Sequence, residues 1–169
     1  MGDTQALTPD DVMTATDQHG QIAHQSLIDH SVRLERTLHE VRDGVWCLVG
    51  NGLSNQTFIT APDGIIAIDT GESIEEMRDA LIELRTVTDA PIVAVIYTHF
   101  HYVSGTQAIL DTEPIEAIWG HARIEGNLRR SATEIAPAYG RGLVEQFAMQ
   151  LPHDGPDGIV NVGLGRAYR

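Results

Sequence analysis

The chain has 169 residues, 42% hydrophobic and 21% charged, which is the size and composition of about one globular domain with a buried core. Its formal net charge of −13 argues against nucleic acid and against an anionic membrane surface as partners. Residues 1–30 lack a basic stretch followed by an apolar run, and no apolar run is long enough to span a bilayer, so we expect neither a signal peptide nor a transmembrane helix and favour a cytoplasmic protein.

The N-terminal segment, residues 1–37, is polar and acidic and shows no strong apolar face. Thr8 and Pro9 form a typical helix start, because threonine caps a first turn well and proline suits the first helical position. We interpret this segment as a partly helical surface arm. The remaining residues, 38–169, are expected to form the folded domain.

From Leu38 onwards the pattern changes to short apolar runs separated by turns rich in Gly, Asp and Asn. The runs predict strands at residues 45–49, 56–60 and 65–69. Because the connections are short, the simplest arrangement is an antiparallel meander. The single cysteine, Cys47, lies in the first of these strands. It excludes an intrachain disulfide and is expected to be a buried core thiol.

A helix follows these strands. Ser73 and Glu76 have the spacing of a capping box. Apolar residues then recur on one helical stripe, which predicts a helix that ends near residues 85–88. Pro91 precedes a continuous apolar run at residues 92–97, and such a run predicts a strand that is buried on both faces.

The second half of the chain contains shorter elements. We expect a short helix around residues 107–110, a strand at 115–119, a helix at 122–130, and a loop from Pro152 onwards, where Gly and Pro are frequent. A run of strands followed by alternating helices and strands predicts an α/β fold, in which a mixed sheet carries packed helices.

The loop at residues 98–105, which reads Thr-His-Phe-His-Tyr-Val-Ser-Gly, follows the most apolar strand. His99 and His101 are two positions apart, so on an extended segment both imidazoles point the same way and can reach one metal ion. The ends of buried strands are also where open α/β sheets bind ligands. From spacing alone, two histidines that only satisfy loop hydrogen bonds remain an equal alternative.

Several segments in this order resemble the metallo-β-lactamase superfamily, and within it the alkylsulfatase group. They are residues 50–59, 63–70, 93–99, 151–158 and 162–165, and the resemblance runs from about His30 to the C-terminus. It implies a partial αββα sandwich, in which mixed sheets lie face to face with helices outside. It also implies metal-dependent hydrolysis of a sulfate or related ester by a metal-bound water, with zinc or another divalent transition metal as cofactor.

The metal loop departs from the family pattern His-x-His-x-Asp-His. His99 and His101 match its first two positions, whereas Val103 and Ser104 stand where the aspartate and the last histidine are expected. Valine cannot ligate a metal and serine is a poor zinc ligand, so the resemblance predicts at most one ion, held by His99 and His101. The matching aspartate, Asp69, is expected to orient a ligand rather than bind the metal.

Two further residues are weaker candidates. Tyr102 could donate a hydrogen bond to a sulfate oxygen, and His121, just after the predicted strand at 115–119, could be an additional ligand. A packed loop tyrosine and a helix-start histidine are the alternatives.

The remaining metal ligands of the family lie in the second half of its fold. The resemblance therefore predicts that this chain is an N-terminal half, inactive alone, whose exposed apolar sheet face needs a second chain or a homo-oligomer to complete the fold. The favoured function is an alkylsulfatase-like hydrolase of a small-molecule ester. The alternative is a non-catalytic binding or assembly subunit that has lost its metal centre. Val103 and Ser104 favour the alternative, and His99, His101 and Asp69 favour the hydrolase.

Overall fold

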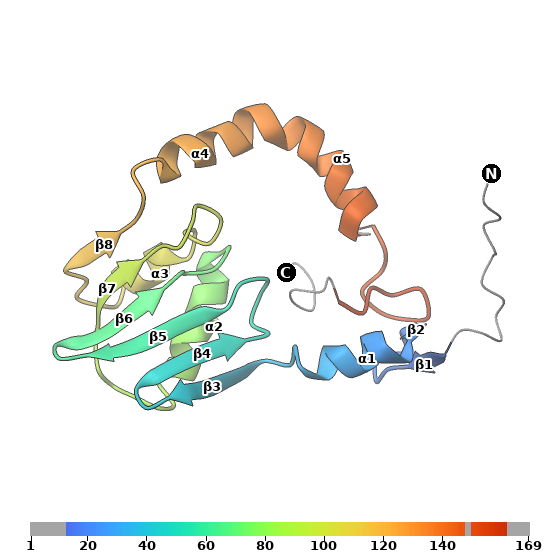
Figure 1. Cartoon of the computed structure of the whole chain (residues 1–169), viewed down its shortest axis with the longest axis horizontal. Helices are drawn as coiled ribbons and strands as arrows, with labels where there is room; N and C mark the ends of the chain where they lie inside the picture. The colour runs from blue at the N-terminus through green and yellow to red at the C-terminus, as the bar shows by residue number, and fades with distance from the viewer. Residues whose placement is uncertain (1–12, 148–149, 162–169) are drawn as a thin grey trace.

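A six-stranded mixed sheet forms the centre of the computed structural model, which describes residues 13–147 and 150–161 (Figure 1). The strands lie side by side in chain order, from β3 to β8. Their bounds are β3 (Thr37–Arg42), β4 (Val45–Val49), β5 (Gln56–Ala61), β6 (Gly64–Ile68), β7 (Ile92–Ile96) and β8 (Ala117–Trp119). The first four strands pair antiparallel, and β6, β7 and β8 pair parallel. This confirms the predicted α/β fold with a mixed sheet.

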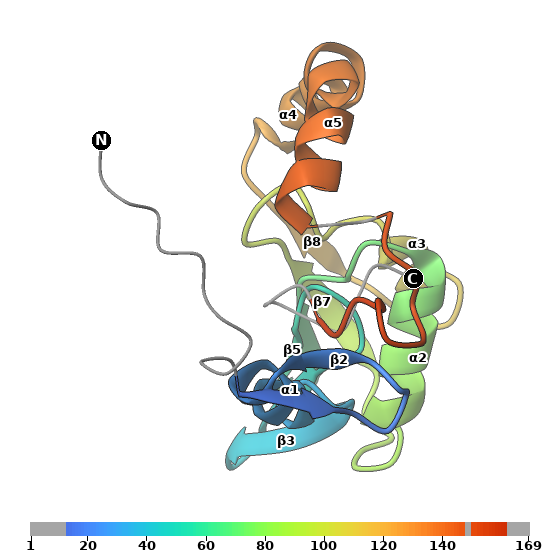
Figure 2. The same ribbon diagram turned by 90° about the vertical axis from the view of Figure 1, so that its right-hand side faces the viewer.

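Helices α2 (Ile74–Leu84) and α3 (Thr106–Leu110) lie on one side of the sheet (Figures 1 and 2). The predicted cap of α2 is present, because Ser73 Oγ accepts a hydrogen bond from the Glu76 backbone N–H at 3.0 Å. The reciprocal bond of a capping box differs. The Glu76 side chain reaches past Ser73 and accepts the backbone N–H of Glu72 at 2.9 Å.

The two faces of the sheet differ in burial. On the face toward α2, the cross-strand neighbours Phe58, Ala67 and Val95 are fully buried. A second cross-strand row runs over the opposite face, and none of its members is fully buried. This row, here called the open row, comprises Cys47, Thr57, Ile68, Ile96 and Trp119. The hydrophobic core therefore lies between the sheet and α2, and the opposite apolar face is only partly covered by the described residues.

Two expectations about burial were wrong. Strand β7 is not buried on both faces, since Ile92 and Val95 are inaccessible while Ile96 is 37% exposed. Cys47 is half-buried rather than a core thiol. The reason is the same in both cases: Cys47 and Ile96 belong to the open row, which no described element packs against closely enough to bury.

The N-terminal segment contains more structure than a partly helical arm. A two-stranded antiparallel hairpin, β1 (Thr14–Thr16) and β2 (Ile22–His24), precedes α1 (Gln25–Val32). The segment 150–161 has no helix or strand, as expected, and contacts this region through Gln21 Nε2, which donates to the Ile159 carbonyl, and Asn161 Nδ2, which donates to Ser31 Oγ. The helix start predicted at Thr8 and Pro9 lies outside the described residues, and the boundary at 37/38 stays a prediction.

Beyond β8, the helix expected at 122–130 is longer than predicted. It begins as α4 (Ile124–Arg130), continues through a π-helical turn (Ser131–Ile135) and ends as α5 (Ala136–Phe147). Figure 1 shows this helix arching away from the sheet. None of its residues is fully buried.

Candidate metal centre

The loop that carries the histidines leaves β7 beside the end of β6, because these two strands run parallel and Ile68 pairs with Ile96. Asp69 follows immediately after β6 and is 8% exposed. Its backbone has φ of 58°, and it is the sole non-glycine residue with positive φ in the part of the chain that the structure describes. Aspartate tolerates this conformation better than most residues. The turn directs its carboxylate toward the start of the histidine loop.

Asp69 holds this loop through Thr98. Its Oδ1 accepts the Thr98 backbone N–H at 2.9 Å, and its Oδ2 accepts the Thr98 hydroxyl at 2.6 Å. Thr98 Oγ1 also lies 2.8 Å from His99 Nδ1. Since the single hydroxyl hydrogen is donated to the carboxylate, the proton between Thr98 and His99 must belong to Nδ1. His99 is therefore held as the Nδ1–H tautomer, which leaves its Nε2 lone pair available to a metal ion.

The second histidine lies against the first. The ring centroids of His99 and His101 are 5.1 Å apart with an interplanar angle of 76°. Phe100 and Tyr102 contact the same two rings, Phe100 lying 4.1 Å from His101 between centroids. Burial and, secondarily, the electrostatic interaction with His99 lower the pKa of His101. A lowered pKa favours the neutral imidazole, which is the form that ligates metals.

Acidic residues surround Tyr102. Its pKa is raised first by burial and then by the negative charges of Glu72, Glu76 and Asp69, so the phenol keeps its proton and can donate a hydrogen bond. Burial and the neighbouring Glu76 also raise the pKa of Glu72. This negative field favours a cation near the loop and opposes a bare anion, so an anionic ester needs a cation to offset it.

The far end of the loop is fixed to the residues that follow β6. The Thr70 backbone N–H donates to the Tyr102 carbonyl at 2.8 Å, and the Thr70 and Thr106 hydroxyls lie 3.0 Å apart. Gly105 packs so closely here that a Cβ atom would lie 1.9 Å from the Thr70 carbonyl oxygen. Sequence reasoning missed these contacts. The sequence pointed to Thr98 and Thr70 only by position, because Thr98 precedes His99 and Thr70 follows Asp69.

The remaining positions of interest are exposed or make ordinary local contacts. His121 is exposed and its Nδ1 accepts the Arg123 backbone N–H at 3.1 Å, which is an ordinary role at the start of α4. Val103 uses its carbonyl to accept the Thr106 hydroxyl, and Ser104 is exposed.

The donor chemistry fits a transition metal only in part. His99 and His101 supply two neutral imidazoles, whereas a catalytic zinc site needs about three protein ligands. No group of three or more His, Cys, Asp or Glu side chains that could hold an ion occurs within residues 13–147 and 150–161. The two predicted ligands lie close together, and the described residues do not complete the set.

A family model described as the metallo-β-lactamase superfamily matches residues 49–160, which is more than half of the chain. A linear primary-alkylsulfatase from Pseudomonas sp. (strain ATCC 19151) is 43% identical over 113 residues, covering 63% of this chain and 21% of the relative. Another linear primary-alkylsulfatase from Pseudomonas sp. is 31% identical over 137 residues, covering 76% of this chain and 20% of the relative.

Among solved structures, the stereoselective inverting sec-alkylsulfatase Pisa1 from Pseudomonas sp. matches with a TM-score of 0.72 at 23% sequence identity. The match covers 86% of this chain and 24% of that one, and it shows that the fold is shared. The chain thus spans about a fifth of the length of the curated relatives that it matches. No helix of the described residues has the length and apolarity needed to cross a membrane.

Proposed function

The chain belongs to the metallo-β-lactamase superfamily, and we propose that it forms part of an alkylsulfatase-like hydrolase that cleaves a sulfate or related ester. The relatives that support this reading are named alkylsulfatases, and they are about five times longer than the matched region. We further propose that His99 and His101 hold at most one metal ion, zinc or another divalent transition metal. Such an ion, when bound, supplies a Lewis acid for hydrolysis.

The observation that carries the proposal is the hydrogen-bonded series from Asp69 through Thr98 to His99. A histidine that merely satisfies a loop needs no fixed tautomer, whereas a ligand histidine is commonly oriented by a carboxylate or another acceptor at its second nitrogen. Here the carboxylate acts through one hydroxyl, and Nε2 is left for the metal. The neutral form of His101 is favoured as well.

A non-catalytic role is the second candidate, and a specific observation favours it. Val103 and Ser104 remove two ligand types from the loop, and the described residues offer no cluster of three possible ligands. On this reading the chain keeps the fold and the loop geometry but serves as a binding or assembly subunit.

We also propose that a second chain, or a second copy of this one, covers the open row. Its aliphatic and aromatic members, Ile68, Ile96 and Trp119, form a continuous apolar band across three strands. Trp119 is 65% exposed and Ile96 is 37% exposed. Contiguous exposed apolar surface of this kind is typical of an interaction site.

Zinc binding separates the two functions. The purified 169-residue chain is stripped with a chelator, and zinc affinity and stoichiometry are then measured by calorimetry. We expect no more than one ion per chain and at least a tenfold weaker affinity in His99→Ala. His39→Ala is the matched control, because His39 is an exposed histidine on β3. The zinc affinity of this variant should equal that of the wild type. A wild type that binds no zinc contradicts the proposal that His99 and His101 of this chain hold an ion, and favours the assembly subunit. We expect no alkyl sulfate hydrolysis by this chain alone.

A further inference from the structure

Glu76 is a buried carboxylate on α2 without a cationic partner. It is 8% exposed, and none of the ion pairs found within the described residues includes it. Its oxygens accept three hydrogen bonds instead, from Gln56 Nε2 at 2.6 Å, Ser54 Oγ at 3.3 Å and the Glu72 backbone N–H at 2.9 Å. A buried carboxylate is costly unless such donors satisfy it.

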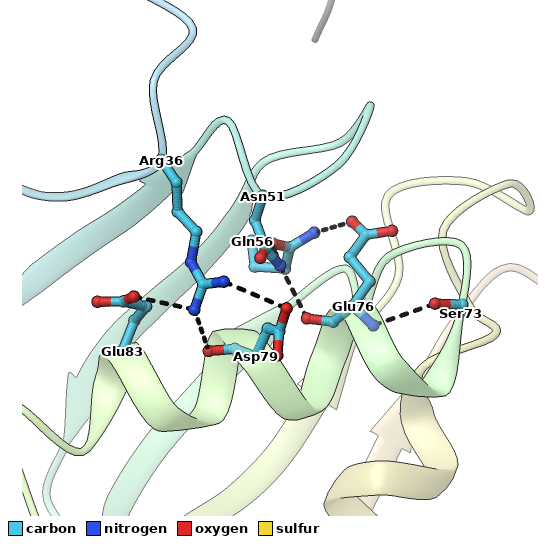
Figure 3. A network of polar contacts seen from close by, with 7 residues as sticks. All are labelled: Arg36, Asn51, Gln56, Ser73, Glu76, Asp79 and Glu83. Carbon is cyan, nitrogen blue, oxygen red and sulfur yellow. Dashed lines mark hydrogen bonds and ion pairs between the residues drawn. The ribbon is translucent and has the colours of Figure 1, made fainter. Parts of the chain in front are cut away.

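The other acidic residues on this helix behave differently. Asp79 and Glu83 both pair with Arg36, at 3.2 Å and 2.9 Å, and so fasten the start of β3 to α2 (Figure 3). All three of these side chains are about one-third exposed. Glu76 lies nearer the beginning of the helix, and Figure 3 shows its carboxylate turned toward the amide group of Gln56 rather than toward the arginine.

Two glycines leave the space that the Glu76 carboxylate fills. A Cβ atom on Gly52 would lie 2.4 Å from its carboxyl carbon, and a Cβ atom on Gly71 would lie 2.6 Å from it. Asn51 adds a further tie, because its Nδ2 donates to the Glu76 backbone carbonyl at 2.8 Å. Glu76 thus joins three segments: loop 50–54, loop 69–73 and the first turn of α2.

Loop 69–73 is also the segment that holds the candidate metal centre. Asp69 binds Thr98 through both carboxylate oxygens, and Thr70 binds the Tyr102 carbonyl. Gly105 packs against the Thr70 and Ser73 carbonyl oxygens. The position of loop 69–73 therefore decides the position of the histidine loop at both of its ends.

We propose that Glu76 is a positioning residue for the candidate metal centre, which acts by fixing loop 69–73 and through it the placement of His99 and His101. This proposal rests on the proposed function only where it predicts a change in zinc affinity. The change that it predicts in amide hydrogen exchange depends only on the hydrogen bonds described above.

The test is Glu76→Gln in the full chain. Glutamine keeps the shape of the side chain but places an NH₂ group where an oxygen accepts from Gln56 or Glu72. Glu75→Gln is the matched control, since Glu75 is the exposed neighbour on the same helix and loses the same charge. Amide hydrogen exchange is followed by NMR at Thr70 and Thr98, and compared with the amides of β5 and β6. Zinc affinity is measured on the same samples.

We expect exchange at Thr70 and Thr98 to accelerate at least tenfold more than in β5 and β6, and zinc to bind at least tenfold more weakly. Glu75→Gln should change neither. Uniform acceleration, unchanged exchange at the loop, or selective acceleration with unaltered zinc affinity would each overturn the proposal. If the wild type binds no zinc, the proposed function fails while exchange still decides the role of Glu76. If Glu76→Gln does not fold, Ser54→Ala takes its place, because it removes one of the three donors to the Glu76 carboxylate. Exchange at Thr70 and Thr98 should then accelerate at least threefold more than in β5 and β6.

Discussion

Gly105 offers a direct measurement of how tightly the histidine loop is packed. Its backbone, with φ of −78° and ψ of −6°, suits alanine, so the cost of Gly105→Ala is steric rather than conformational. The new Cβ would lie 1.9 Å from the Thr70 carbonyl oxygen, 2.6 Å from Met77 Cβ and 2.8 Å from the Ser73 carbonyl oxygen. Two of these three atoms belong to the backbone, and they cannot move away by a change of rotamer.

The expected loss of stability follows from two opposing terms. Overpacking costs up to about 3 kcal/mol, and replacing glycine by alanine returns about 1 kcal/mol by restricting the unfolded chain. We therefore expect Gly105→Ala to lower the free energy of unfolding by about 2 kcal/mol, which corresponds to a fall in Tm of about 4–8 °C for a chain of this size.

Urea denaturation followed by tryptophan fluorescence measures this loss as a lower midpoint at unchanged slope. Gly126→Ala is the control, because Gly126 lies in α4 with no atom within 4 Å of its added Cβ, and alanine should stabilise the helix by about 0.5–1 kcal/mol. A Gly105→Ala midpoint equal to or above that of the wild type would refute the packing argument.

Two further predictions concern charge and assembly. Burial and the charge of Glu76 raise the pKa of Glu72 in the folded state above its ordinary value of 4.5. Ionised Glu72 therefore destabilises the folded state at neutral pH, and this effect disappears at a pH low enough to protonate Glu72 in both the folded and the unfolded chain. Glu72→Gln should therefore be more stable than the wild type at pH 7 and match it near pH 4, and a urea-midpoint difference that grows toward low pH contradicts this. For the open row, light scattering should give a mass above the 18.5 kDa of one chain. A monomer that binds no hydrophobic dye would disprove an uncovered apolar face.

Much of the sheet was predictable because its signals are local. Strands β4, β5 and β6 are bounded by turns such as Asp43-Gly44, where Gly44 adopts a φ of 70°. Helix α2 was predictable from its cap at Ser73 and its single apolar stripe. The family resemblance singled out His99 and His101, and the structure brings their rings together.

Strand β3 and the contacts around the candidate metal centre were missed for different reasons. Strand β3 has an exposed, largely polar sequence in which Leu38 alone packs against the core, and it forms because β4 offers it hydrogen bonds. The bond from Thr98 to Asp69 spans 29 positions, and the bond from Gln56 to Glu76 spans 20. No window of the sequence contains such pairs, so a capping role was the most that local reasoning could assign to Glu76.

The order of the strands has a consequence for how quickly the chain reaches this structure. Within the six-stranded sheet, neighbouring strands are also consecutive in sequence, from β3 to β8. Closing the loops between β3, β4, β5 and β6 therefore costs little chain entropy, and such local pairings are favoured as early events in folding. The parallel pairing of β6 with β7 must wait for α2 to form and cross over the sheet. We expect this crossover to limit the folding rate, which places the ordering of the histidine loop among the last events.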